Sequence, residues 1–294
     1  MTTIRDLCAD TRRQVFGGLT DQMNVIAENA AAGATELKMS MDITGITAGK
    51  TISSGRNVWY VKGSDAASKT VYVIPGYDNS PKDAVVADDF VYVAPRVTEW
   101  FLFNQVANEI RRMAAADTGL YRIGSWTANV DPIWQTYDIP VEAQNMIGML
   151  RLRYRAPGTP DVWFEIPSRA YTTQFTDDVA RIRLLRSVPA GTQVEFTYKA
   201  PFITPTALDD DAVTVCGLSE SMLDIPVLGA SFRLIRTTES QRNQITSQGD
   251  SRRPNEVASM SNLQTSNLLE RDYEKRVREE ANRLLQRNPY KQEW

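Results

Sequence analysis

Histidine is absent from the sequence, and cysteine occurs only twice, at Cys8 and Cys216. Without histidine the chain lacks the side chain that most often acts as a general base near neutral pH, so a Ser-His-Asp triad is excluded. The two cysteines stand far apart and form no CxxC motif, which excludes zinc sites built from cysteine and histidine. We interpret both thiols as small apolar core residues in a reducing compartment.

Long apolar runs and the common phosphate-binding and nucleophile motifs are also missing. No stretch approaches the roughly 18 to 20 apolar residues of a membrane span, and the first residues lack the apolar core of a signal peptide. The motifs GxGxxG, GxxxxGK[ST] and GxSxG do not occur. We therefore expect a non-enzymatic protein, made in a cytoplasm, that uses no cofactor or metal and contacts no membrane.

Neither sign of charge dominates, because the sequence has 36 acidic and 33 basic residues and a net charge of −3. No whole-chain field therefore indicates nucleic acid as the main partner. The hydrophobic content of 42% is ordinary for a globular protein with real cores.

Apolar residues at three- or four-residue spacing predict helices in three parts of the chain. An amphipathic helix is expected from residue 2 to about residue 30, and a buried helix at 96–116. Asp209-Asp210-Asp211 is interpreted as the N-cap of a helical stretch, with a calcium site as the alternative, and Pro226 is expected to kink the chain before a helix at 227–245. The apolar positions of the first two helices are Ile4, Leu7, Val15, Leu19, Met23 and Ile26, then Trp100, Phe103, Val106, Ile110 and Met113.

Short β-like runs separated by glycines predict a small all-β module at 34–95. Between about residues 120 and 205, apolar and polar residues alternate one by one. Apolar residues expected on the inner face are Leu150, Leu152 and Tyr154, then Val162, Phe164 and Ile166, Ile182 and Leu184, and Val194, Phe196 and Tyr198. Strands of this kind, joined by turns such as Ala156-Pro157-Gly158, predict an antiparallel β-sandwich of jelly-roll type.

A last helix is expected near the C-terminus, where a narrow apolar stripe runs between many charges. The stripe consists of Leu269, Tyr273, Val277, Ala281 and Leu284. So thin a stripe is typical of a helix that docks at a subunit contact. Tyr290 and Trp294 follow it on a tail, and aromatic residues of this kind are enriched as interface anchors.

The fold class expected from these patterns is α+β, with a helical-bundle core that carries a small β module and a jelly-roll-like sandwich as insertions. The expected boundaries are 1–33 for the N-terminal core helix, 34–95 for the β module, 96–118 for a core helix, 119–205 for the sandwich and 206–294 for the C-terminal core helices.

This order of elements resembles the head-to-tail connector, or adaptor, proteins of tailed bacteriophages. The resemblance rests on the residues from Ala34-Thr35-Glu36-Leu37 to Gly45, on the runs 49–52, 58–61, 71–77 and 91–95, and on 224–230 with the helices that follow. Pro75-Gly76-Tyr77 stands where that family more often has Arg-Gly.

The resemblance implies a virion protein in the neck, at the interface of head and tail, that is assembled in the host cytoplasm. It implies a helical adaptor core, a homo-oligomeric ring of most often twelve copies beneath the portal protein, and a tail-side neck or tail terminator protein as a further partner. It also implies a C-terminal segment that reaches the portal. The residues expected to dock there are Leu269, Tyr273, Val277, Leu284, Tyr290 and Trp294.

Four alternatives stay open from the sequence. The chain could be another tail or baseplate protein, or a carbohydrate-binding virion protein that uses Trp126, Trp134 and Trp163. Paired carboxylates of a glycosidase are formally present in the sandwich region, namely Asp131, Asp138, Glu142, Asp177 and Asp178. A basic face that contacts packaged DNA or acidic surfaces of neighbouring subunits is possible if the strands bearing Arg151, Arg153, Arg155, Arg181 and Arg183 are neighbours.

Overall fold

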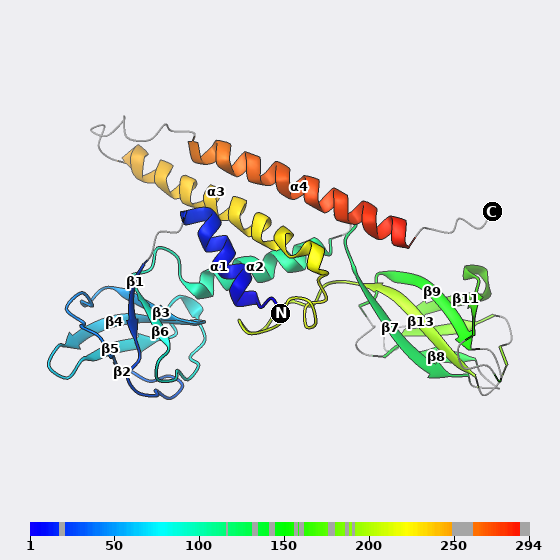
Figure 1. Ribbon diagram of the computed structural model, residues 1–294, viewed down its shortest axis with the longest axis horizontal. Helices are drawn as coiled ribbons and strands as arrows, with labels where there is room; N and C mark the ends of the chain where they lie inside the picture. Colours follow the sequence, from blue (N-terminus) through cyan, green and yellow to red (C-terminus); the bar gives the residue numbers. More distant parts are fainter. Residues whose placement is uncertain are drawn as a thin grey trace. The chain divides into compact units, whose positions relative to one another are not determined.

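The computed structural model describes residues 1–17, 21–115, 117–130, 135–140, 145–155, 158, 162–175, 180–185, 188–189, 192–248 and 261–288. These residues form two compact units (Figure 1). Unit 1 comprises the described residues within 1–110 and 204–276, and unit 2 those within 111–203 and 277–288. Helices and antiparallel sheets are both present, so the expected α+β class is confirmed. Among the described helices, none is long and apolar enough to cross a membrane.

Unit 1 begins with helix α1 (Ile4–Phe16), whose ends are set by local chemistry. Thr3 and Asp6 form a capping box at its start, and Gly17 ends it in the left-handed conformation with φ 62°. The expected helix through residue 30 is therefore wrong. Met23 lies instead in strand β1 (Gln22–Val25), and Ile26 follows that strand; Leu19 is outside the described residues.

A six-stranded antiparallel sheet follows, in the order β1-β6-β3-β4-β5-β2. Its other strands are β2 (Glu36–Lys38), β3 (Thr51–Ser54), β4 (Asn57–Asp65), β5 (Thr70–Pro75) and β6 (Phe90–Val93). A bridge between Ile26 and Met39 joins the chain beyond β1 to the chain beyond β2, so the sheet curls into a small barrel (Figure 1). Its interior is filled by one apolar cluster that includes Leu37, Ile52, Trp59, Val71 and Val91. The expected β module is thus present, with β1 added from the region assigned to the first helix.

The helical part of unit 1 combines α1, most of α2 (Glu99–Met113), α3 (Asp224–Gln248) and the first half of α4 (Ser261–Arg287). Helix α2 lies where it was expected, and Phe103, Val106, Ile110 and Met113 are buried. Hydrogen bonds link α3 to its neighbours: Ser231 Oγ donates to Gln14 Oε1 of α1 at 3.2 Å, and Ser266 Oγ of α4 donates to the Phe232 carbonyl oxygen at 3.0 Å.

The segment before α3, from about residue 204 to Leu223, does not form the helix that was expected to begin at Asp209-Asp210-Asp211. Asp210 and Asp211 do not cap a helix; their carboxylates accept backbone N–H bonds of nearby turns, from Ala207 at 2.8 Å and Thr214 at 2.7 Å. Pro226 does not kink a helix, because it lies in the first turn of α3, where its missing N–H would have no helical partner. The same segment pins the N-terminus through a bridge between Thr3 and Asp211.

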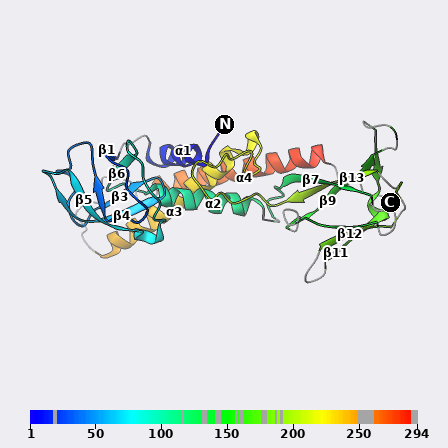
Figure 2. The same ribbon diagram turned by 90° about the horizontal axis from the view of Figure 1, so that it is seen from below.

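Unit 2 contains two antiparallel sheets, in the orders β10-β9-β13-β7 and β11-β12-β8. Figure 2 labels β7, β9 and β13 of the first sheet and β11 and β12 of the second. The described strands are β7 (Arg122–Asn129), β8 (Thr136–Asp138), β9 (Gly148–Arg155), β10 (Trp163–Ile166), β11 (Tyr171–Phe175), β12 (Ala180–Leu184) and β13 (Gln193–Ala200). Strand β7 pairs with β13, and β8 pairs with β12. Strand β9 pairs with both β10 and β13, and β11 pairs with β12.

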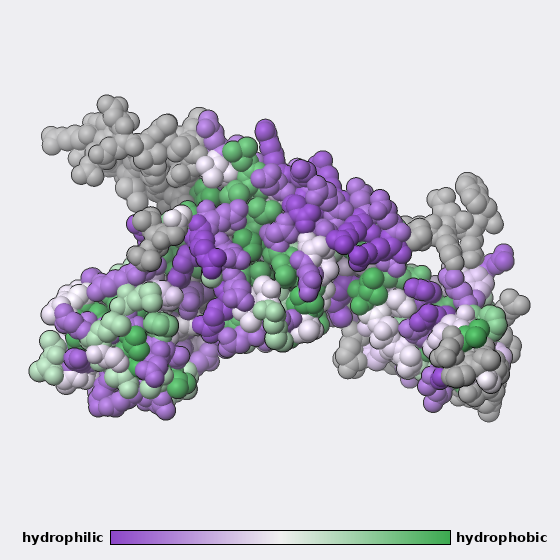
Figure 3. Space-filling view, in the orientation of Figure 1, coloured by the Kyte–Doolittle hydropathy of each residue, from purple (hydrophilic) through white to green (hydrophobic). Residues whose placement is uncertain are grey.

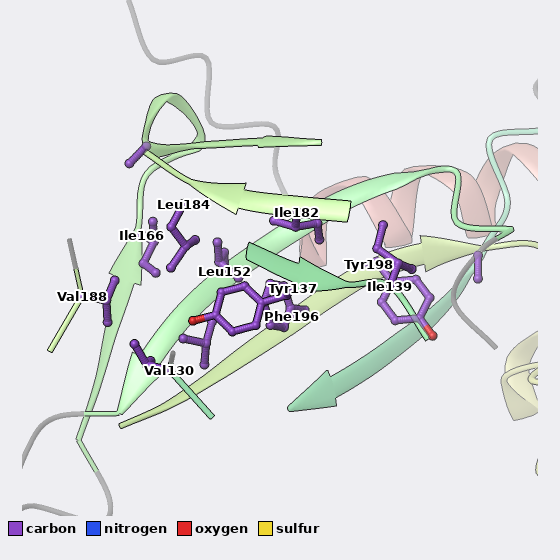
Figure 4. Packing of buried hydrophobic residues seen from close by; sticks show 13 residues of the cluster. Val130, Tyr137, Ile139, Leu152, Ile166, Ile182, Leu184, Val188, Phe196 and Tyr198 are labelled. Carbon is purple, nitrogen blue, oxygen red and sulfur yellow. The ribbon is translucent and has the colours of Figure 1, made fainter. Parts of the chain in front are cut away.

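One apolar core lies between the two sheets of unit 2 (Figure 4). Phe196 of β13 is fully buried, and its ring lies 4.1 Å from that of Trp126 and 5.3 Å from that of Tyr137. The alternation in β12 and β13 is confirmed, since Ile182, Leu184, Val194, Phe196 and Tyr198 are all buried. The expectation for β10 is only partly correct, because Ile166 is buried whereas Val162 and Phe164 are exposed.

Candidate functional site: a groove between α1 and the β-barrel

Reactive side chains are not brought together in the described part of the chain. Burial raises the pKa of the Cys8 thiol to about 12 and that of Cys216 to about 11, so both stay protonated and unreactive near neutral pH. Among the residues that the structure describes, no group of three Asp, Glu or Cys side chains could hold a metal ion. Asp138 is exposed and paired with Arg181 at 2.7 Å, whereas Asp131, Glu142, Asp177 and Asp178 lie outside the described residues.

The tryptophans considered for carbohydrate binding do not form one platform. Trp126 stacks against Phe196 on the inner side of the four-stranded sheet. Trp163 lies opposite Arg155 on the other side of that sheet, with the Arg153 guanidinium 4.8 Å from its ring centre. Trp134 is outside the described residues. The two described tryptophans therefore face opposite ways.

The arginines of unit 2 do not form one basic face. Arg151, Arg153 and Arg155 lie on β9 of the four-stranded sheet, whereas Arg181 and Arg183 lie on β12 of the other sheet. Arg153 is paired with Glu195, and Arg181 with Asp138. The expected condition that β9 and β12 be neighbouring strands is not met, and acidic partners compensate the charges of Arg153 and Arg181.

The apolar stripe of α4 is used within the chain. Val277 and Leu284 are buried, and Leu269 and Tyr273 are half-buried. The Tyr273 ring packs 5.6 Å from that of Phe232 on α3, while hydrophilic residues cover the outer side of α4 (Figure 3). These four side chains therefore contribute to the chain's own packing. Tyr290 and Trp294, the other residues expected to dock a portal, lie outside the described residues.

Unit 1 contains a groove of about 750 Å³ among the described residues. Helix α1 lines one side of it, β1 and β6 of the barrel form its floor, and α2 and Leu208 also contribute to its lining. Sequence reasoning missed this groove because it placed Met23 on a helix. The alternation of Phe90, Val91, Tyr92 and Val93 was the available signal, since it puts Phe90 and Tyr92 on the outer face of the barrel.

The floor of the groove is apolar and partly aromatic. Met23 lies opposite Tyr92 in the pairing of β1 with β6, so both side chains point to the same face of the sheet. Met23 is 41% exposed and Phe90 is 57% exposed, although both are large apolar residues. The guanidinium of Arg12 lies 4.7 Å from the centre of the Tyr92 ring, a cation–π contact that ties α1 to the barrel.

Charged side chains of both signs surround this floor. Helix α1 contributes Arg5, Arg12 and Arg13, and the barrel contributes Asp21, Asp88 and Asp89. Glu99 of α2 also lines the groove. Burial raises the pKa of its carboxyl group above the ordinary 4.5, although the positive charges of Arg12 and Arg5 act to lower it. An apolar floor with charges at its margin is suited to binding an amphipathic segment of a protein.

The fold and the groove thus define a mixed α+β protein with a site of the size that binds a peptide or side chains of a partner. Comparison with models of known protein families and with curated protein sequences finds no match to the chain.

Proposed function

We propose that this chain is a virion structural protein, a head-to-tail adaptor that forms a ring beneath the portal and links the DNA-filled capsid to the tail. One observation carries the proposal. Helices from the beginning, the middle and the end of the chain pack together, while the barrel and the two-sheet unit are inserted between them. The resemblance of the sequence to adaptor proteins implies this layout of a helical core with insertions.

The contacts within the helical core support the proposal because they join segments that are distant in sequence. The Arg233 guanidinium of α3 forms an ion pair with the buried Glu109 of α2. Arg276 of α4 reaches back to the first residue of α3, with its Nε 2.6 Å from Asp224 Oδ2. A core held by such side chains has a defined shape, which repeated copies in a ring need.

Exposed apolar side chains on the barrel offer surface for subunit contacts. Besides the groove, Tyr72 and Ile74 of β5 are 41% and 43% exposed, and Tyr77 packs against Tyr60 at 5.7 Å between ring centres. Aromatic residues are enriched in protein interfaces relative to other surfaces. Assembly into a homo-oligomer, with twelve copies as the resemblance implies, would cover them.

Native mass spectrometry of the purified chain, alone and with portal protein, tests the proposal. The expected result is a homo-oligomer of defined copy number that binds the portal. Localisation by labelled antibodies on purified virions then separates this role from that of another tail or baseplate protein. Label at the neck supports the adaptor, and label along the tail or at the baseplate contradicts it.

A further inference from the structure

We propose that the groove between α1 and the barrel receives the C-terminal residues of a second copy of this chain, with Tyr290 entering its apolar floor. The inference rests on the proposed ring, since it assigns a contact between neighbouring copies. It goes beyond that proposal by naming both surfaces of the contact.

The floor requires an apolar occupant. Met23 and Phe90 are 41% and 57% exposed, and they lie beside Tyr92 on one face of the sheet formed by β1 and β6. Exposed large apolar residues gathered in a concave site mark a binding surface more strongly than single ones do. A volume of about 750 Å³ is within the range of sites that bury several side chains or a short peptide.

The margin specifies the charge of the occupant. On the barrel side, Asp21 and Asp88 have no basic side chain within ion-pair distance among the residues described. The Asp89 carboxylate accepts the Val86 N–H at 2.9 Å. On the α1 side, Arg12 donates to the Val97 carbonyl oxygen at 3.3 Å and faces the groove. The favoured occupant therefore has an aromatic residue, basic residues near it, and an acidic residue further along.

The sequence after Leu284 fits this description. In the sequence Tyr290 stands between Arg287 and Lys291, whose positive charges complement Asp21 and Asp88, and an acidic residue, Glu293, follows. The six residues from Pro289 to Trp294 can span about 20 Å when extended, enough to cross such a groove. The tail and the groove are different surfaces of the chain, so their contact between copies is of the head-to-tail kind from which closed rings are built.

A peptide-binding experiment tests the two surfaces. The probe is a fluorescent synthetic peptide with the sequence of residues 284–294, titrated into the chain truncated after Asn288 and followed by anisotropy. We expect saturable binding that Phe90→Asp or Met23→Asp weakens at least tenfold. Ile74→Asp, a similarly exposed apolar position on β5 of the same barrel, is the matched control and should leave binding unchanged. Peptides with Tyr290→Ala or Lys291→Glu should also bind at least tenfold more weakly, and these variants cannot alter the fold of the protein.

A mixing experiment tests whether the contact joins two copies. The chain with Phe90→Asp keeps its tail, and the chain truncated after Asn288 keeps its groove, so neither should assemble alone. Their mixture should give a heterodimer in native mass spectrometry, with one tail in one groove. Absence of the heterodimer despite peptide binding would overturn the proposal, because the tail would then occupy the groove of its own copy.

Two further results of the peptide titration would count against the proposed contact. Equal binding of the peptide to the Phe90→Asp protein and to the unaltered groove would overturn the proposal. So would binding of the peptide to portal protein but not to this chain; in that case the adaptor function would stand, and the tail would be a portal contact.

Discussion

Gly229 of α3 faces the carboxyl group of Glu109 on α2, and a Cβ atom placed on Gly229 would lie 2.5 Å from both Cγ and Cδ of Glu109. Glu109 is 1% exposed and pairs with Arg233, one turn further along α3. Glycine inside a helix costs stability through its backbone freedom. Here its lack of a side chain makes room for a buried charge that joins the two helices.

Gly229→Ala should therefore destabilise the protein despite the better helix propensity of alanine. The propensity gain is at most about 1 kcal/mol, whereas overpacking a rigid core contact costs about 1–3 kcal/mol. We expect the free energy of unfolding, measured with urea, to fall.

The control for this prediction is the same substitution in a Glu109→Ala background. With the carboxyl group removed, alanine at 229 has space, and the second substitution should be neutral or stabilising. A coupling energy of at least about 1 kcal/mol is expected from the double-mutant cycle. Additive effects of the two substitutions would show that the contact between Gly229 and Glu109 does not limit the packing.

Tyr273→Ala tests whether the apolar stripe of α4 serves the chain itself. Its ring packs on Phe232, so we expect a loss of about 1–3 kcal/mol in the free energy of unfolding of the chain without any partner. Leu268→Ala, an exposed position on the same helix, is the matched control and should change stability by less than about 0.5 kcal/mol. If Tyr273→Ala left stability unchanged and weakened only portal binding, the original assignment of Tyr273 to docking would be correct.

Fragments of unit 2 test its domain boundary. Residues 145–199 contain strands with clear alternation, yet this fragment lacks β7, which pairs with β13 along its whole length, and β8. We expect residues 119–205 to give a β-type circular dichroism spectrum with a cooperative thermal transition, and residues 145–199 to stay unfolded. A cooperative transition in the shorter fragment would contradict the structural role of β7.

The carboxyl group of Glu99 gives a prediction for pH. Because burial raises its pKa above 4.5, the folded chain binds more protons at this site than the unfolded chain between the ordinary and the raised value. Stability contributed by this site therefore falls as the pH rises through that window. Glu99→Gln should unfold at higher urea concentration than the unaltered chain at about pH 7, with a smaller difference below about pH 4. A difference that is the same at both pH values would contradict this account.

Sequence patterns predicted those elements whose burial is set by their own periodicity. Helix α2 and strands β12 and β13 each have one buried face, so the spacing of their apolar residues matches their structure. Strand β1 was missed because Met23 and Ile26 also fit a helical spacing, and only the left-handed Gly17 ends α1 before them. The exposure of Phe164 could not be foreseen, because it depends on how far the second sheet covers the first.

The groove could not be predicted from local patterns, since its walls come from α1, β1, β6 and α2. Its apolar members Met23 and Phe90 look like ordinary core residues in the sequence, and only their exposure in the folded chain distinguishes them. The apolar stripe of α4, unlike the groove, is visible in the sequence. Its spacing was recognised, but an apolar stripe alone does not reveal whether the helix packs on its own chain or on a partner.

Electron microscopy of the purified chain mixed with portal protein tests the adaptor function most directly. The account predicts a ring of repeated copies bound to one end of the portal assembly, visible in negative stain, and no ring bound to an unrelated ring protein used in place of the portal. A chain that remains monomeric and leaves the portal assembly bare would contradict it.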